Sequence, residues 1–428
     1  MKKVGLIALG CAKNLVDAEV LLGFLRKDGY EICAELAECD VVIVHTCTFI
    51  DAAKTESIDA ILEAADYKAR KLKKLIVTGC MAERYKHEIM TSIPEVDAVL
   101  GSKSFDRIDQ AIECDGKYEY YAPLTTPTPE GPRVLTSAPY SVYVKVADGC
   151  SNHCSYCVIP IVRGEFAARR FEDILEEVHT LADNGAKEIN LVAQDTTRFP
   201  YLCDLIREIC KIDRIKWVRV LYCYPSTITD ELLVLMTEEP KFVKYIDVPL
   251  QHASGRILKL MNRKGDADTL LQQVEYIRRM VPEVSLRTTF ITGFPKESEE
   301  DFAVLSDFVR HAKFNHVGVF PYSREGGTVA GRMHGQVPEE VRQQRADLIM
   351  TQQLTLLEQI NRQYIGHIYD VLCEGKLDEQ YTGRAYFQAP DVDGRIFFTS
   401  DIPVNAGEFM RVRIDRAERY DLYGKRVD

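Results

Sequence analysis

Three cysteines, Cys150, Cys154 and Cys157, fall within eight residues of the stretch VADGCSNHCSYCVIP, which spans 146–160. Thiols at this spacing can form disulfides or bind a soft metal centre. The chain has 13 cysteines in 428 residues, an odd number and far below the density of a disulfide-rich scaffold. We therefore interpret these three cysteines as ligands of a metal centre.

Two kinds of metal centre compete for this motif. Structural zinc usually takes four protein ligands, often from paired CxxC knuckles, and the chain has no second CxxC motif. His153 lies inside the motif, but we interpret it as an ordinary loop residue. An iron–sulfur cluster held by three cysteines leaves one iron open for a substrate, so we favour a cluster over zinc.

Three further cysteines, Cys11, Cys47 and Cys80, each follow an apolar run in the first hundred residues. Helical patterns follow these runs, and such alternation predicts a doubly wound parallel α/β sheet. Ligands of these sheets bind beyond the carboxyl ends of the strands. One cysteine there could be a small buried hydrophobic residue, but three at equivalent positions predict ligands that converge on one point.

A second αβ series begins near residue 136 and must position the motif of 146–160. It holds six strand-like runs separated by helical patterns, which predicts a partial (β/α)6 TIM-like barrel with its site at the strand carboxyl ends. The motif follows the first run and so should lie at this mouth. The six runs cover residues 141–148, 187–195, 217–225, 244–251, 285–293 and 316–323.

The final sixty residues contain short strand-like runs divided by Gly, Pro and Asp, which predicts a small antiparallel β-barrel. A Pro- and Thr-rich stretch separates the two αβ series and reads as a linker. We therefore predict four segments: an N-terminal domain over 1–115, a linker over 116–135, a barrel core over 136–366 and a terminal barrel over 367–428.

Composition limits the function classes. The chain is 46% hydrophobic and 28% charged, as in ordinary globular proteins, and its net charge is −11. That charge argues against a general nucleic-acid binder, although a local basic patch is compatible with it. The N-terminal apolar run is too short for a signal segment, and no run approaches the roughly 18 apolar residues of a membrane span. We expect a cytoplasmic protein without a membrane partner.

The spacing CxxxCxxC, with the aromatic Tyr156 before its last cysteine and a predicted barrel strand before it, resembles the radical S-adenosylmethionine superfamily. The resemblance implies that Cys150, Cys154 and Cys157 hold a 4Fe–4S cluster whose open iron binds S-adenosyl-L-methionine. It also implies that an electron from the cluster cleaves the sulfonium and releases a deoxyadenosyl radical, while the barrel positions this radical and excludes water.

The same resemblance suggests residues that contact S-adenosylmethionine. The segment RTTFITGFP looks like the superfamily's strand-to-loop segment beside the cofactor. It contributes Arg287, the main chain near Ile291, and Gly293, which would let the backbone approach closely. Gln194 ends another strand-like run, and Tyr156 lies within the motif. A capping or packing role is the alternative for each of these residues.

The two cysteine groups and the terminal barrel together resemble the radical S-adenosylmethionine methylthiotransferases over the whole chain. In that family a second 4Fe–4S cluster is held by one cysteine after each of three strands, which Cys11, Cys47 and Cys80 match, and the end domain is a TRAM domain. Such enzymes insert sulfur at an activated carbon and transfer a methyl group from a second S-adenosylmethionine. The implied partners include a reducing electron donor and a sulfur source.

The stretches GCAKNLVDAE, CSYCVIPIVRG, LVAQDTTR and YDLYG resemble the RimO-type branch, which modifies an aspartate of small-subunit ribosomal protein twelve. The transfer-RNA branch usually reads GCQMN at the first of these stretches. The sequence departs from the RimO-type pattern at Ala12, Ala18, His45 and Lys296, and the last lies near the expected cofactor loop.

Charge also bears on the substrate. Residues 369–428 contain 9 Lys and Arg against 12 Asp and Glu, a net of −3, which suits a basic ribosomal protein better than RNA. RNA is instead favoured by four arginines that are close in sequence and could bind phosphates, at 411, 413, 416 and 419. The alternatives are a methylthiotransferase acting on adenosine of transfer RNA, a non-catalytic iron–sulfur carrier, which needs no six-unit barrel, and a zinc-dependent binding protein.

Overall fold

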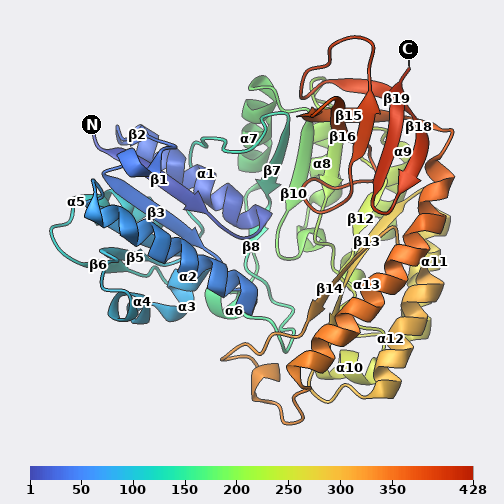
Figure 1. The fold of residues 1–428 in the computed structure, drawn as a ribbon, viewed down its shortest axis with the longest axis horizontal. Coiled ribbons are helices and arrows are strands. Elements are labelled where there is room, and N and C mark those ends of the chain that lie inside the picture. The colour runs from blue at the N-terminus through green and yellow to red at the C-terminus, as the bar shows by residue number, and fades with distance from the viewer. Residues whose placement is uncertain (428) are drawn as a thin grey trace.

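The computed structural model describes residues 1–427 and divides them among three domains (Figure 1). An α/β domain with one sheet lies on the left of the view, a larger strand–helix domain lies in the centre and right, and a small β-barrel lies at the upper right. This order confirms the predicted fold class, from doubly wound sheet through partial barrel to small terminal barrel.

The N-terminal sheet has six parallel strands in the order β2-β1-β3-β4-β5-β6. The three predicted runs form the neighbouring strands β1, β3 and β4, so their carboxyl ends lie side by side. The last strand, β6, falls within the predicted linker of 116–135, where its short sequence YEY pairs with β5. The elements are β1 Lys3–Ala8, α1 Ala12–Lys27, β2 Glu31–Ile32, β3 Val41–Thr46, α2 Asp51–Asp66, β4 Lys74–Gly79, α3 Cys80–Tyr85, α4 His87–Ser92, β5 Ala98–Leu100, α5 Ile108–Glu113 and β6 Tyr118–Tyr120.

The central domain contains the six predicted strands as two three-stranded parallel sheets, β7-β10-β11 and β12-β13-β14. An isolated parallel bridge from Val218 to Phe242 and the packing of β11 against β12 join them into one open arc. The strands are β7 Ser141–Lys145, β10 Glu188–Val192, β11 Trp217–Val220, β12 Tyr245–Asp247, β13 Ser285–Thr292 and β14 His316–Pro321.

Helices cover the outside of this arc, and α11 and α12 both begin with a capping box, at Asp266 and Ser298. A long helix, α13, follows the last strand and packs against β14. The helices are α6 Ile159–Val162, α7 Phe171–Asp183, α8 Leu202–Cys210, α9 Asp230–Glu238, α10 Gly255–Leu260, α11 Ala267–Met280, α12 Glu299–Ala312 and α13 Glu339–Asn361, with a short antiparallel pair, β8 Ala147–Asp148 and β9 Ala167–Ala168.

The C-terminal domain is a closed barrel in the order β15-β16-β17-β19-β18. Its pairs are antiparallel except β17 with β19, which is parallel. The strands are β15 Ile368–Leu377, β16 Gln380–Arg384, β17 Ile396–Thr399, β18 Phe409–Glu418 and β19 Asp421–Arg426.

The end of β16 and the segment after it dock on the amino ends of the central strands. Arg384 donates to Glu188, the first residue of β10, at 2.7 Å, and Arg219 of β11 lies 3.1 Å from the same carboxylate. All three side chains are buried. Asp393 accepts from Tyr245 at the start of β12 at 2.7 Å. The small barrel therefore closes the end of the arc opposite the mouth, which leaves the carboxyl ends as the open side. Within residues 1–427 no helix is long and apolar enough to cross a membrane.

Candidate metal centres between two domains

The loop that carries Cys150, Cys154 and Cys157 follows β8 and lies at the carboxyl ends of the central strands, as predicted. The Cys150 N–H donates to the carbonyl of Gly164 at 3.0 Å, which closes the loop. Gly149 makes this closure possible, because it has a φ of +72° and a Cβ there would lie 2.1 Å from the Glu165 carbonyl oxygen. The Ser155 N–H and hydroxyl donate to carbonyls of Met261 and Leu260, so the middle of the loop is also fixed.

The three thiols of this loop are half-buried and none is in a disulfide. Burial raises the pKa of Cys150, and it raises the pKa of Cys157 to about 12. The guanidinium of Arg263 lies 3.7 Å from the Cys154 sulfur and is held there by the Pro249 carbonyl at 2.6 Å. A fixed cation next to a thiol stabilises a thiolate or an anionic cluster that the thiol binds.

Tyr156 and Gln194 both lie beside this loop. Tyr156 packs on the central core, and the charge of Arg263 acts on its hydroxyl. The Gln194 amide nitrogen donates to Asp148 at 3.1 Å, whereas its oxygen is buried without a partner among the described residues. A buried acceptor without a donor is costly, so this oxygen fits a ligand that brings an N–H or O–H group.

The three residues expected from the segment RTTFITGFP lie at different depths along β13 and the loop after it. Arg287 is the third residue of the strand, near its amino end, and its guanidinium pairs with Asp393 of the small barrel at 2.5 Å. Ile291 lies near the carboxyl end, where its N–H donates to the Gln251 carbonyl at 2.8 Å. The space beside Gly293 is taken by Arg342, whose Cγ lies 2.2 Å from an ideal Cβ. Ile291 is therefore near the mouth, Arg287 is not brought to the loop, and the close approach at Gly293 is made by α13.

The second group, Cys11, Cys47 and Cys80, lies at the carboxyl edge of the N-terminal sheet, one cysteine after each of β1, β3 and β4. An ideal Cβ on Gly10, next to Cys11, would lie 3.0 Å from the Cys47 sulfur. Asn14 ties the edge together, because its amide nitrogen donates to the carbonyls of Leu9 and Thr46, both at 3.0 Å. The three thiols therefore converge, as the strand pattern predicts.

The pKa shifts of these three thiols differ in direction. Burial raises the pKa of Cys47, and it raises the pKa of Cys80 to about 12. Burial also disfavours the thiolate of Cys11, but the charges of Lys13 and Arg163 and the backbone N–H groups of Asn14 and Lys13 together outweigh it, so the pKa of Cys11 lies below its ordinary value. Cys11 is the exposed member of the group. A metal centre here would bind deprotonated thiols, so iron loading would release protons.

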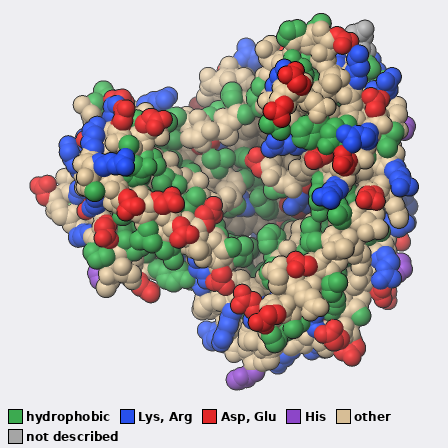
Figure 2. All heavy atoms as spheres, in the orientation of Figure 1, with side chains coloured by type: hydrophobic (Ala, Val, Ile, Leu, Met, Phe, Trp, Pro, Cys, Tyr) green, Lys and Arg blue, Asp and Glu red, His purple; other side chains and the backbone are tan. Residues whose placement is uncertain are grey.

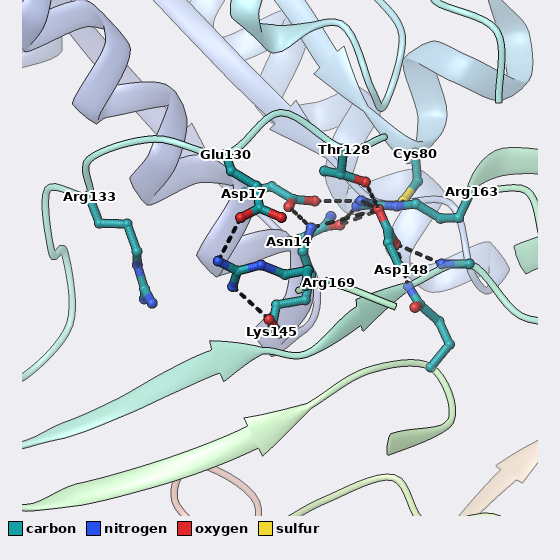
Figure 3. A network of polar contacts seen from close by, with 12 residues as sticks. Asn14, Asp17, Cys80, Thr128, Glu130, Arg133, Lys145, Asp148, Arg163 and Arg169 are labelled. Atoms are coloured by element: carbon teal, nitrogen blue, oxygen red, sulfur yellow. Dashed lines mark hydrogen bonds and ion pairs between the residues drawn. The ribbon is translucent and has the colours of Figure 1, made fainter. Parts of the chain in front are cut away.

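One arginine of the central domain reaches the N-terminal cysteine group (Figure 3). Arg163 follows the loop of Cys150, Cys154 and Cys157 and crosses into the N-terminal domain, where its Nε donates to the Cys80 sulfur at 3.3 Å. Its Nη2 donates to the Asn14 amide oxygen at 2.5 Å. Arg163 is buried, and α6, the helix before it, packs against α3. The two cysteine groups therefore face one junction between domains.

Carboxylates complete this network. The Nη1 of Arg163 pairs with Asp17 and lies 3.4 Å from Asp148, and Lys145 pairs with the same two acids. Burial opposes the ionisation of Asp148, yet Lys145 and Arg163 hold its pKa well below the usual range. The buried charges are thus two cations and two anions, and removal of one cation would leave an uncompensated carboxylate.

We expect Arg163→Met to destabilise the protein by about 3–5 kcal/mol, because it leaves Asp17 and Asp148 with one cation between them in a buried site. Urea unfolding followed by circular dichroism measures this change, and the midpoint should fall. Arg170→Met is the control, since that side chain is exposed and its ion pairs are loose. Equal midpoints for the two variants would contradict the role of Arg163 as a buried link.

The chemistry around both groups fits an iron–sulfur cluster. Each thiolate of a 4Fe–4S cluster binds a different iron, so its ligands stand farther apart than those of zinc. The cations Arg263 and Arg163 beside Cys154 and Cys80 also match the negative charge of such a cluster.

Several residues of these sites are not evident from the sequence. Arg163, Arg263 and Asp148 carry no local signal, because each acts through contacts distant in sequence. Lys13 and Asn14 lie two and three residues after Cys11, and this proximity was a signal that could have found them.

Comparison with family profiles divides the chain in the same way. The family described as uncharacterized protein family UPF0004 matches residues 3–101, the radical SAM superfamily matches 144–309, and the TRAM domain matches 365–427. The two cysteine groups fall in the first and second of these ranges.

Curated relatives match the chain over nearly its full length. It is 46% identical to the ribosomal protein uS12 methylthiotransferase RimO of Pelotomaculum thermopropionicum, over 99% of each chain. It is 43% identical to the protein of that name from Clostridioides difficile, over 99% of this chain and 98% of the relative. These matches confirm the resemblance drawn from the motifs.

Solved structures show the fold. The radical S-adenosylmethionine methyltransferase TsrM from Kitasatospora setae, with cobalamin and a [4Fe-4S] cluster bound, aligns with a TM-score of 0.58 and 14% identity, covering 77% of this chain and 74% of that one. The cobalamin-dependent S-adenosylmethionine radical enzyme OxsB aligns with a TM-score of 0.52 and 11% identity, covering 82% and 56%. At such identities the likeness concerns the arrangement of the domains only.

Proposed function

Because the chain belongs to the ribosomal protein uS12 methylthiotransferase (RimO) family, we propose that it methylthiolates the β-carbon of an aspartate in that small-subunit ribosomal protein. The observation that carries the proposal is the pair of three-cysteine groups beside one domain junction, where Arg163, which follows the loop of the second group, donates to Cys80 of the first. A carrier protein would need neither the open mouth of a strand arc nor a second group beside it.

The residues divide into two cluster sites in this proposal. Cys150, Cys154 and Cys157 hold a 4Fe–4S cluster with one iron left for S-adenosylmethionine, and a second 4Fe–4S cluster is held by Cys11, Cys47 and Cys80. When bound, these groups supply the carbon radical that removes a substrate hydrogen and the sulfur and methyl group that replace it.

The protein's own side chains bind and orient these groups. Arg263 places a positive charge beside Cys154, and the Gln194 oxygen offers an acceptor to the amino group or ribose of S-adenosylmethionine. Tyr156 and the main chain near Ile291 line the same mouth. We leave Arg287 out of the proposed contacts, because its guanidinium is occupied by Asp393. The small barrel seals the opposite end of the arc against water.

The substrate proposal rests on the family and on charge. The net charge of the chain is −11, and basic ribosomal proteins are complementary to such a surface. We propose that the reaction takes place in the cytoplasm, where ribosomes are present, with an external reductant and an external sulfur source. Modification of adenosine in transfer RNA is the competing activity.

The test offers both substrates to one preparation. Anaerobically reconstituted, reduced enzyme is incubated with S-adenosylmethionine, sulfide and either the ribosomal protein or transfer RNA that carries isopentenyl- or threonylcarbamoyl-adenosine. We expect a methylthio mass gain on the protein and on its aspartate-containing peptide, with none on the RNA. A gain on the RNA alone would overturn the proposal, and the protein with Asn in place of its target aspartate is the control.

A further inference from the structure

Lys13 is a buried cation that lies beside the ligand Cys11 and also faces the central domain. It lies two residues after Cys11, in the first turn of α1, and only 7% of its surface is exposed. This turn is inserted against the central strands, since Val16 packs in one cluster with Tyr143 and Leu221. Lys13 therefore projects from the N-terminal domain toward the interior of the strand arc.

The ammonium of Lys13 interacts with the thiol of Cys11, but among the described residues it has no carboxylate partner. Its Nζ lies 3.2 Å from the centre of the Tyr222 ring, and no described carboxylate of residues 1–427 lies within ion-pair distance of it. Asp247 attracts it from farther away, but that carboxylate already accepts from the Tyr222 N–H at 3.0 Å. Lys145, by contrast, is equally buried and pairs with two acids. A buried ammonium without a carboxylate is costly, so a bound anion would stabilise it.

The position of Lys13 relates it to the substrate. Tyr222 follows the carboxyl end of β11, so the ammonium lies on the side of the arc where ligands bind. Tyr222 also has a φ of +61°, a strained backbone of the kind held at functional sites. Cys11 beside Lys13 is exposed, and Figure 2 shows the surface hollowed between the N-terminal domain and the central domain.

We propose that Lys13 binds the side-chain carboxylate of the substrate aspartate and makes the site selective for aspartate over asparagine. This inference rests on the proposed function. The β-carbon is bonded directly to the carboxylate carbon, so an ammonium that holds the carboxylate also fixes the carbon that is to be modified. Aromatic contact with Tyr222 keeps the ammonium in place while leaving its N–H groups for the carboxylate oxygens.

Binding, measured without a reductant so that no turnover occurs, tests the proposal. The probes are the ribosomal protein and the same protein with Asn at the target position, titrated into reconstituted enzyme that holds S-adenosylmethionine. Wild type should bind the aspartate form about 10- to 100-fold more tightly, the difference expected for a hydrogen-bonded charge pair. Lys13→Met should bind both forms equally and weakly, whereas Lys13→Arg should keep much of the preference.

The controls separate this role from others. Lys27→Met, at the exposed last residue of the same helix, should bind as wild type does. Iron content and circular dichroism of the Lys13 variants should equal those of wild type. An undiminished aspartate preference in Lys13→Met, or a loss of iron with the preference kept, would overturn the proposal and assign the cation to the cluster. If wild type methylthiolates transfer RNA and does not modify the ribosomal protein, the proposed function is wrong, and the inference about Lys13 is then wrong as well.

Discussion

Replacing Cys150, Cys154 and Cys157 with Ala should halve the iron content of the reconstituted protein, from about eight to about four atoms per chain, and abolish cleavage of S-adenosylmethionine. Cleavage requires an iron with a free coordination position, and these three thiols belong to a closed loop at the mouth of the arc, beside Arg263. Iron analysis and chromatography of the cleaved nucleoside measure the two effects.

A matched control uses cysteines outside both groups. Cys33, Cys114 and Cys203 are also half-buried, and none of them belongs to either cysteine group. Their triple Ala variant should keep all its iron and its cleavage activity. If the loop variant retained full iron, or the control lost half of it, the assignment of the first cluster to 150–157 would be wrong.

The positions of both cysteine groups were predictable because they depend on strand order and on little else. Cys11, Cys47 and Cys80 each follow an apolar run, and parallel strands bring their carboxyl ends to one edge. The alternation of runs and helical patterns also predicted the six central strands. Short strands such as β5 and β6 were not predicted, since three residues carry too little periodicity to be recognised.

Contacts between domains were not predictable, because they join residues far apart in the sequence. Arg163 and Cys80 are 83 positions apart, and nothing local marks that arginine as a partner of a thiol. Arg287 shows the opposite error. It was expected near the cofactor, but five residues separate it from the end of β13, roughly 16 Å along a strand. At that depth it meets Asp393 of the small barrel, whose docking the sequence did not reveal.

The N-terminal cysteines should have a different effect from the loop cysteines. With Cys11, Cys47 and Cys80 replaced by Ala, the protein should hold about four irons, still cleave S-adenosylmethionine, and form no methylthiolated product. The loop of 150–157 is closed by its own backbone bonds and by Met261 and Leu260, none of which needs the N-terminal thiols. This variant should therefore keep radical formation while losing sulfur delivery.

The network around Arg163 makes this separation testable. Arg163 would lose its thiol acceptor at Cys80 but keep Asn14, Asp17 and Asp148, so the two domains should stay docked in the triple variant. Its urea midpoint should accordingly lie above that of Arg163→Met. Cleavage of the cofactor without product, in a protein of near-normal stability, would place sulfur delivery at the N-terminal group. Full methylthiolation by this variant would remove that role from the N-terminal domain and leave the first cluster to do both steps.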